Sequence, residues 1–280
     1  SSDLTLVATG TGSGKTECFL YPIISHCLQL RDEQATPGIV AVLVYPMNAL
    51  AEDQLGRLRE LLAGSGVGFG MYVGKTPEHE REVVGRRMPS GSTREDYVQA
   101  VARSANDKDA QAIHPAEERA SREAMRAQPP RILLTNVKQL ELLLTRSRDV
   151  ELFDGSLLRY LVFDEAHTFS GAQGAETACL IRRLRTFCGK RADEVVCVAT
   201  SATIADPVRG EAAGREFAAR FFGVAPSSVA LVHEQYEGDA WAPAQARKVP
   251  GPLPGDPAVQ LKNVLDAVRE VEAETPTPAA

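Results

Sequence analysis

The sequence predicts a doubly wound α/β domain with a mostly parallel sheet and a helical insertion. Short runs of consecutive apolar and β-branched residues alternate with helical patterns along most of the chain, which is typical of parallel strands covered by helices on both faces. The 280 residues are 44% hydrophobic and 24% charged. This is a globular composition, and the chain is long enough to bury a core without disulfide or metal staples.

The first elements follow one another from the start of the chain. A strand is expected at residues 4–8, where a short apolar run meets a glycine-rich turn, and helical spacing follows over residues 17–30. A second strand at residues 39–45 (IVAVLVY) leads into a helix at residues 48–63. Residues 67–73 form a weaker candidate strand, because glycines interrupt the apolar run.

Three further short strands are expected, each followed by a helical pattern. They lie at residues 132–135, 160–163 and 195–199. Sheets of this class bind ligands at the carboxyl ends of their strands, so the chemistry is expected in the turns that follow these runs.

Two stretches interrupt the alternation. Residues 75–129 hold ten basic and ten acidic side chains, which is typical of a solvated insertion. We expect exposed helices in it, one starting at the capping box of residues 92–95 and one near Pro115. Residues 236–280 hold seven of the 17 prolines and are expected to form a linker with an accessory helix. Residues 1–235 are therefore the expected main domain.

Charge and composition exclude several classes of protein. The net charge of −6 argues against nucleic-acid binding by bulk charge, so any such contact must be local. No apolar run approaches the ~20 residues of a membrane span, and no leader opens the chain. The five cysteines form no C-x-x-C pair and sit in apolar stretches, which favours buried free thiols in a reducing compartment. We expect a cytoplasmic protein with no membrane partner.

The strongest chemical signal is the strand, glycine-rich turn and helix start of residues 6–16 (LVATGTGSGKT). Glycines let successive backbone N–H groups face a phosphate, and the helix N-terminus adds positive potential. Lys15 is expected to reach the β/γ-phosphates of ATP, and the Thr16 hydroxyl to bind Mg²⁺. The candidate nucleotide-binding residues are Thr9, Gly10, Thr11, Gly12, Ser13, Gly14, Lys15 and Thr16. The strict pattern has glycine at the first of these positions, where this chain has threonine.

In residues 160–167 (YLVFDEAH), two adjacent carboxylates follow the apolar run of residues 160–163. A buried strand would deliver them at its carboxyl end, beside the glycine-rich loop if the two strands are neighbours. Asp164 is expected to hold Mg²⁺, and Glu165 to polarise the attacking water. A third segment, residues 199–203 (ATSAT), places short hydroxyl side chains after another strand. Such hydroxyls can hydrogen-bond a nearby carboxylate or histidine, although alone they would indicate only a turn.

These three segments, in this order, resemble motifs I, II and III of the superfamily-2 DEAD/DEAH-type helicases. The resemblance implies a RecA-like P-loop domain, the first of two in such proteins, that uses ATP and Mg²⁺. It implies that Lys15, Asp164 and Glu165 act in ATP hydrolysis. His167, Ser201 and Thr203 would couple hydrolysis to movement.

Segments between the anchors are similar to one branch of that superfamily. Residues 45–54 (YPMNALAEDQ) resemble motif Ia, which holds the nucleic-acid backbone. Residues 132–136, 163–171 and 217–223 resemble the large helicase-related and MrfA-like DNA helicases and the motor subunits of antiphage systems. The implied strand-binding residues are Pro46, Asn48, Gln54, Gly74, Thr135 and Asn136. Contacts from such residues to phosphates need little net positive charge, which agrees with the −6.

The resemblance implies an ATP-dependent DNA helicase or translocase, acting on single-stranded or duplex nucleic acid in bacterial defence or DNA repair, with defence or repair proteins as further partners. Relatives have a second RecA-like domain that supplies arginine fingers, and the 77 residues after Thr203 are too few for one. We therefore expect a fragment of a larger protein that is inactive in isolation. The alternative is a nucleotide-dependent scaffold without translocation. A pure nucleotide switch needs neither motif Ia nor the third motif.

Overall fold

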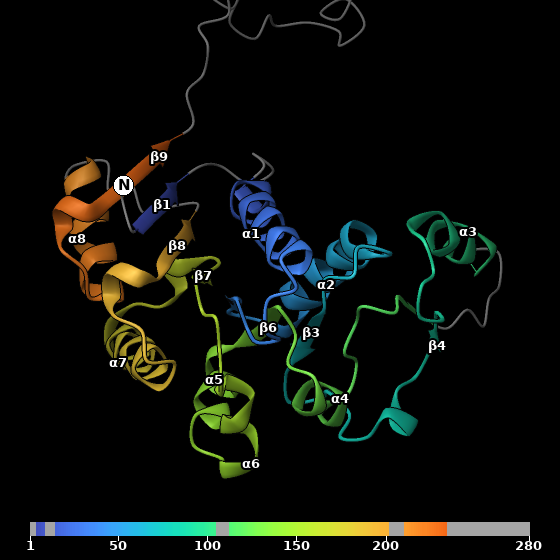
Figure 1. Cartoon of the computed structure of the whole chain (residues 1–280). Coiled ribbons are helices and arrows are strands. Elements are labelled where there is room, and N and C mark those ends of the chain that lie inside the picture. Colours follow the sequence, from blue (N-terminus) through green and yellow to red (C-terminus); the bar gives the residue numbers. More distant parts are fainter. Residues whose placement is uncertain (1–3, 9–14, 105–111, 202–209, 234–280) are drawn as a thin grey trace, which may run out of the picture. The chain divides into compact units, whose positions relative to one another are not determined.

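The structure, a computed structural model, describes residues 4–8, 15–104, 112–201 and 210–233. Its main sheet contains β1 (Leu4–Ala8), β2 (Ala41–Tyr45), β3 (Phe69–Tyr72), β6 (Ile132–Asn136), β7 (Tyr160–Phe163), β8 (Val196–Ser201) and β9 (Val229–His233). The order across the sheet is β3-β6-β2-β7-β8-β1-β9, and every pairing is parallel (Figure 1). The predicted parallel α/β sheet is confirmed. The edge strand β9 was not expected.

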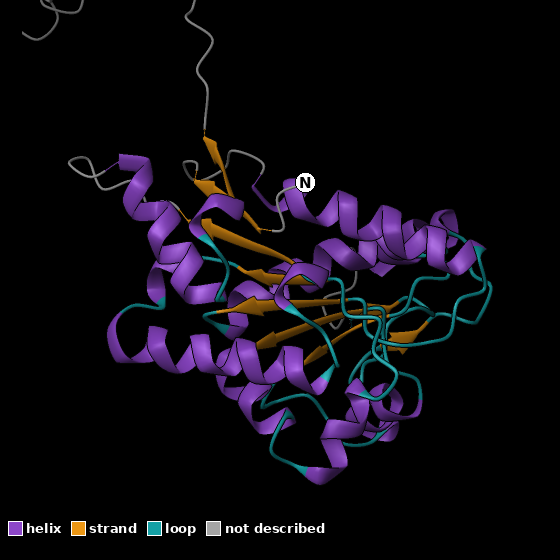
Figure 2. Cartoon of the chain, turned by 60° about the vertical axis from the view of Figure 1, so that its left-hand side comes forward, coloured by secondary structure: helices purple, strands orange, loops and turns teal. Residues whose placement is uncertain are grey.

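Helices cover both faces of the sheet (Figure 2). The helices α1 (Lys15–Asp32) and α2 (Asn48–Leu62) pack on one face, and α5 (Val137–Leu143), α7 (Gly171–Phe187) and α8 (Gly210–Phe222) pack on the other. The central strand β2 contributes side chains to both apolar cores. Leu43 and Tyr45 face the first group of helices, and Val42 and Val44 face the second. This explains why its sequence is apolar at every position rather than at alternate ones.

An insertion separates β3 from β6. Its elements are a 3₁₀ turn (Glu80–Glu82), β4 (Arg86–Arg87), α3 (Arg94–Ser104), β5 (Ile113–His114) and α4 (Arg122–Ala127). The two short strands pair in parallel and form a second, separate sheet. A small apolar cluster of Ala63, Met88, Tyr97 and Ile113 joins the insertion to the end of α2. The expected linker and accessory helix of residues 236–280 lie outside the described residues.

The two expected helix starts in the insertion need correction. The helix α3 starts one residue later than the proposed capping box, because the Thr93 hydroxyl accepts the backbone N–H of Asp96 at 3.2 Å. No helix begins at Pro115. The next helix, α4, begins after Ser121, whose hydroxyl accepts the N–H of Ala124 at 3.1 Å. The hydroxyl of Ser121 caps the first turn and so fixes the start of α4, whereas a proline is only tolerated in a first turn and cannot cap it.

A buried ion cluster anchors the insertion to α2. The Arg59 guanidinium donates two hydrogen bonds of 2.7 Å to the carboxylate of Glu118, which is 2% exposed. Nδ1 of His114 lies 3.1 Å from the same carboxylate, and Nε2 lies 3.1 Å from the carbonyl of Val84. The hydrogen bond to Glu118 raises the pKa of His114. Burial alone would raise the pKa of Glu118, but hydrogen bonds from Arg59 and His114 bring it below the ordinary value.

This cluster predicts a pH dependence of stability. Because the folded pKa of His114 lies above its ordinary value of 6.5, its contribution to the free energy of unfolding is fully present below that pH. It is lost as the pH rises through the folded pKa. Urea unfolding at a series of pH values should therefore show a steeper loss of stability above pH 6.5 in the wild type than in His114→Gln. Equal slopes in the two proteins would show that His114 is not a charged partner of Glu118.

The five cysteines differ in their exposure to solvent. All five cysteines are free thiols, as expected, but Cys18 and Cys179 are exposed, which corrects the expectation that all five are buried. Burial raises the pKa of Cys27 and of Cys197 to about 12, so these two thiols stay protonated.

Among the described residues, no helix combines the length and the apolar character that crossing a membrane requires.

Candidate functional site

The predicted nucleotide-site residues gather at the carboxyl end of the central strands. Lys15 and Thr16 begin α1, which follows β1, whereas Asp164 and Glu165 follow β7. The two strands are not neighbours, because β8 lies between them. The side chains must therefore meet across the end of β8. The remaining candidates lie outside the described residues: Thr9, Gly10, Thr11, Gly12, Ser13, Gly14 and Thr203.

Lys15 and Glu165 do meet across that strand. Nζ of Lys15 lies 3.9 Å from Oε1 of Glu165, with the two side chains 10% and 26% exposed. This ammonium is buried and has no hydrogen-bond partner within the described part of the chain. Burying a charged donor without an acceptor is costly. The arrangement suits a site that receives an anion with oxygen acceptors.

The backbone of Glu165 is strained. Its φ of 51° and ψ of 47° lie in the left-handed region, which few residues other than glycine adopt. Its carbonyl accepts hydrogen bonds from the backbone N–H and the hydroxyl of Thr168, at 2.9 and 2.8 Å. Strain of this kind persists only where neighbouring groups hold it, and it clusters at functional sites. Here it turns the chain sharply directly after Asp164.

Thr200 holds these two carboxylate residues together. Its hydroxyl donates to Oδ1 of Asp164 and accepts the backbone N–H of Glu165 at 3.1 Å. Thr200 is fully buried, and the β7–β8 register pairs Phe163 with Ala199, directly before the two partners. This residue was not among the predicted site residues. The signal for it was the run of hydroxyls after the strand, but the sequence does not show which hydroxyl faces the carboxylate.

His167 connects the carboxylates to the end of β8. Its Nδ1 lies 3.3 Å from the hydroxyl of Ser201 and 3.3 Å from Oε2 of Glu165. Ser201 is fully buried, whereas the His167 side chain is 35% exposed. One partly exposed ring therefore touches both the carboxylate and the third motif. The arrangement can transmit a change at Glu165 to β8.

A tyrosine lies near the aspartate. Tyr45, the last residue of β2, is fully buried. Burial, and then the negative charge of Asp164, raises the pKa of Tyr45 well above its ordinary value. The phenol is therefore neutral at physiological pH and adds no second negative charge beside Asp164.

The donor set fits a nucleotide-bound magnesium ion better than a protein-caged metal. In residues 4–233, leaving aside the gaps in the description, no group of three or more His, Cys, Asp or Glu side chains could hold a metal ion. Thr16 and Asp164 instead offer one hydroxyl and one carboxylate. Mg²⁺ is commonly bound by one or two protein oxygens together with substrate phosphates and waters. The Lys15 ammonium, which has no hydrogen-bond partner among the described residues, can supply the charge that such phosphates require.

The candidate strand-binding residues lie on the neighbouring strand ends, and two of them contact each other. Nδ2 of Asn136 donates to Oδ1 of Asn48 at 2.8 Å, which the parallel pairing of Tyr45 with Asn136 makes possible. Oδ1 of Asn136 also caps α5 by accepting the N–H of Gln139 at 2.8 Å. Asn48 is exposed. The pair therefore presents fixed amide groups at the carboxyl edge of the sheet.

The other four candidates are more dispersed. Pro46 is half-buried beside the asparagine pair, and Gly74 is exposed in the loop after β3. Gln54 lies further along α2, and its Oε1 is buried without a hydrogen-bond partner among the described residues. Thr135 is a correction: it is fully buried, and its hydroxyl donates to the Tyr72 carbonyl at 2.8 Å. Its side chain stabilises the β3–β6 pair and is not on the surface.

Comparison with known proteins gives a consistent set of similarities. The model of the DEAD/DEAH box helicase family matches residues 1–94 and 94–209. The chain is 31% identical to the Druantia protein DruE of Escherichia coli (strain UMEA 4076-1), over 81% of this chain and 16% of DruE. It is 26% identical to the uncharacterized ATP-dependent helicase YprA of Bacillus subtilis (strain 168), over 72% of this chain and 21% of YprA. The chain thus spans about a fifth or less of these relatives.

Solved structures agree with the sequence comparison. The crystal structure of the DUF1998 helicase MrfA bound to DNA and AMPPNP superposes with a TM-score of 0.52 at 26% identity, covering 82% of this chain and 24% of MrfA. The helicase Mss116 bound to single-stranded RNA and UDP-BeF superposes with the same TM-score at 18% identity. At that identity the likeness concerns the fold alone.

Proposed function

The chain belongs to the DEAD/DEAH box helicase family, and from this premise we propose that it is the first RecA-like motor domain of an ATP-dependent helicase or translocase that acts on DNA. The observation that carries the proposal is the cluster of Lys15, Asp164, Glu165 and Thr200 at the carboxyl end of three parallel strands. A parallel sheet of this class binds its ligand at that edge.

The residues of the cluster divide the chemistry of ATP hydrolysis between them. Lys15 binds the terminal phosphates, and its ammonium has no hydrogen-bond partner among the described residues that would compete with them. Thr16 and Asp164 would hold Mg²⁺, which would supply positive charge against the charge that develops on the phosphates. Glu165 orients and polarises the attacking water from a backbone position that Thr200 fixes. Because Thr200 also bonds Asp164, it holds the Asp164 carboxylate against the backbone of Glu165.

His167 and the end of β8 would couple this chemistry to movement. The contacts of His167 with Glu165 and Ser201 link the site of hydrolysis to the strand whose last hydroxyl is Ser201. We include Thr203 and the glycine-rich loop of residues 9–14 in the same site on the strength of the motifs alone, since they lie outside the described residues.

Nucleic acid would bind at the neighbouring strand ends. Asn48, Asn136 and Gly74 present amide and backbone groups at the carboxyl edge of β2, β6 and β3, with Pro46 beside them. Such groups contact phosphates and sugars, and an acidic domain can use them. We favour DNA because the structure of the related MrfA contains DNA. Gln54 is retained as a candidate, because its buried and unpaired amide oxygen could be satisfied by a rearrangement of α2.

The wider organisation is also a proposal. A second RecA-like domain would close over the nucleotide and supply arginine fingers. Residues 236–280 would form the linker and accessory helix after a domain of residues 1–235, with residues 75–129 as its charged insertion. A cytoplasmic location and a role in bacterial defence or DNA repair, with protein partners from those systems, follow from the branch that the motifs resemble.

The test is the ATP turnover of the full-length protein, measured alone and with single-stranded DNA, duplex DNA and RNA in parallel. We expect DNA to stimulate turnover and RNA to do so less. A rate that no nucleic acid changes would contradict the motor and support a nucleotide-dependent scaffold. Stimulation by RNA alone would correct the choice of polymer and leave the motor standing.

A further inference from the structure

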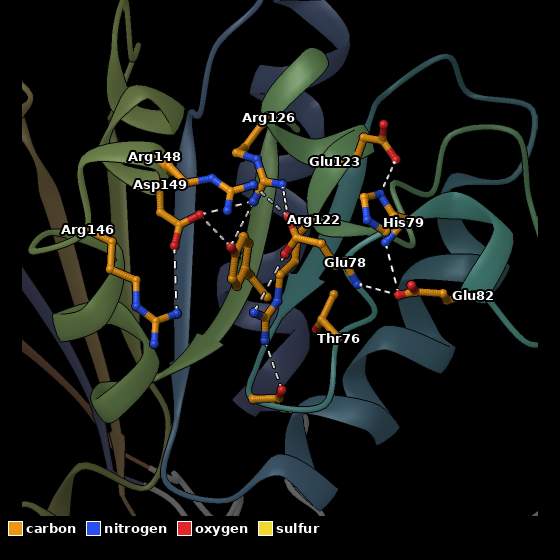
Figure 3. Close-up of polar contacts among 12 residues, drawn as sticks. Thr76, Glu78, His79, Glu82, Arg122, Glu123, Arg126, Arg146, Arg148 and Asp149 are labelled. Carbon is orange, nitrogen blue, oxygen red and sulfur yellow. Dashed lines mark hydrogen bonds and ion pairs between the residues drawn. The ribbon is translucent and has the colours of Figure 1, made fainter.

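We propose that Arg146 and Arg148 bind backbone phosphates of the nucleic acid and so extend the strand-binding surface to the outer strand β3. This inference rests on the proposed function, because it names a further surface for the same ligand. The two residues lie on either side of the start of the short helix α6 (Ser147–Val150). They belong to an arginine cluster, defined here as Arg122, Arg126, Arg146 and Arg148 (Figure 3).

One carboxylate of the cluster is shared by three of the arginines. Glu78 forms ion pairs with Arg126, with Arg148 at 3.2 Å and with Arg122 at 3.9 Å. A single carboxylate can neutralise only one of these guanidinium groups. The positive charges of Arg148 and Arg122 are therefore only partly neutralised by Glu78.

The other carboxylate is Asp149, whose side chain is 5% exposed. It accepts a hydrogen bond of 2.6 Å from the hydroxyl of Tyr72 and one of 3.2 Å from Arg126, while Arg146 lies 3.9 Å away. Both hydrogen bonds end on Oδ1, whereas Arg146 faces Oδ2 from 3.9 Å, beyond hydrogen-bonding distance. Four guanidinium groups share two carboxylates, so the cluster has a formal excess of two positive charges in a chain of net charge −6.

The cluster has an inner and an outer pair. The side chains of Arg122 and Arg126 are 18% and 19% exposed, whereas those of Arg146 and Arg148 are 49% and 76% exposed. The inner pair therefore holds the cluster together, and the outer pair can reach a ligand. A guanidinium is planar and offers paired donors that match a phosphate, so the outer pair suits phosphodiesters.

The inner pair ties the cluster to a loop already placed on the strand-binding surface. Arg122 donates to the carbonyls of Val73 and Gly74 at 3.2 and 2.9 Å, and its guanidinium lies 5.2 Å from the centre of the Tyr72 ring. A chain of contacts thus runs from Arg148 through Glu78 and Arg122 to Gly74.

The order of the strands makes the loop after β3 a continuation of the strand-binding surface. Because β3, β6 and β2 are adjacent, Gly74, Asn136 and Asn48 follow the same edge of the sheet. A strand that crosses this edge would pass from the amide pair to the arginines.

Binding of labelled single-stranded DNA to the full-length protein, measured by fluorescence anisotropy over a series of salt concentrations, tests the inference. Each phosphate contact on single strands contributes about 0.7 to the slope of log affinity against log salt. The double variant Arg146→Ala/Arg148→Ala should therefore lower the slope by about 1.4 and weaken binding on the order of tenfold at low salt, equally for all sequences. Arg146→Lys/Arg148→Lys keeps both charges and should keep the slope.

The matched control is Arg191→Ala/Arg220→Ala. These side chains are 75% and 78% exposed and are ion-paired with Asp193 and Glu216, but they lie near the starts of β8 and β9, at the opposite edge of the sheet. Their loss should leave both slope and affinity as in the wild type.

Each other outcome is decisive. Wild-type affinity and slope in the Arg146→Ala/Arg148→Ala variant would overturn the inference and leave the proposed function intact. Weaker binding with an unchanged slope would assign the two arginines a structural role, and an equal loss in the control would indicate a bulk charge effect. A wild-type protein that binds no DNA would contradict the proposed function itself.

Discussion

Replacing Glu165 by glutamine should leave ATP binding intact and lower ATP turnover by about two or more orders of magnitude. Glutamine keeps the size of the side chain, and the hydrogen bond from the residue 165 N–H to Thr200 is a backbone contact that the change does not remove. The glutamine amide cannot polarise water as a carboxylate does. Binding of a fluorescent nucleotide and steady-state phosphate release, both on the full-length protein, separate the two effects.

A nearby carboxylate provides the control for this variant. Glu176 is exposed on α7, so Glu176→Gln removes one negative charge at the surface and should turn over ATP like the wild type. If the Glu165 variant loses binding and turnover together, the residue holds the fold or the metal instead of the attacking water.

Replacing Lys15 by alanine should abolish ATP-dependent activity without lowering the stability of the fold. The side chain is 10% exposed, and its ammonium has no hydrogen-bond partner in the described residues, so the relief of a buried charge offsets the packing that the lysine methylenes lose. The loss falls on the phosphates, which then lack their positive partner. Nucleotide binding, phosphate release and a circular-dichroism melt should show no binding, no turnover and a melting temperature no lower than the wild type.

Lys190→Ala is the matched control for Lys15→Ala. Lys190 is a half-buried lysine in the turn before β8, at the opposite edge of the sheet, and its loss should not affect ATP turnover. A Lys15 variant that unfolds would identify a structural lysine. Unchanged turnover would contradict the assignment of the glycine-rich loop.

Several features of the fold could be predicted because they depend on neighbouring residues alone. The apolar run of residues 39–45 indicates a strand buried on both faces, and β2 has that burial at every position from Ala41 to Tyr45. The helix α2 begins at Asn48, where the local pattern places it, and α1 begins at Lys15, two residues before the expected helical spacing. The edge strand β9 was missed, since a short apolar run beside a proline-containing turn has no distinctive period.

The candidate site was predictable in residue type but not in its contacts. The order of the motifs pointed to Lys15, Asp164, Glu165 and Ser201 before their distances were known. Thr200 was missed, because a strand turns successive side chains to opposite faces and the sequence does not state which hydroxyl of residues 199–203 meets Asp164. Thr203 lies outside the described residues and stays a prediction. Thr135 was wrongly placed on the surface for the same reason.

The sequence by itself determined the parallel α/β class, the motifs and the types of residue that carry the chemistry. These depend on local apolar periodicity and on short spacings along the chain. Only the tertiary structure decided that β8 separates the two halves of the nucleotide site, that His114 pairs with Glu118 in the anchor of the insertion, and that four arginines from α4 and the start of α6 share two carboxylates. Strand order, register and long-range ion pairs join residues that are tens of positions apart, and their energy depends on burial and distance, which no local pattern encodes.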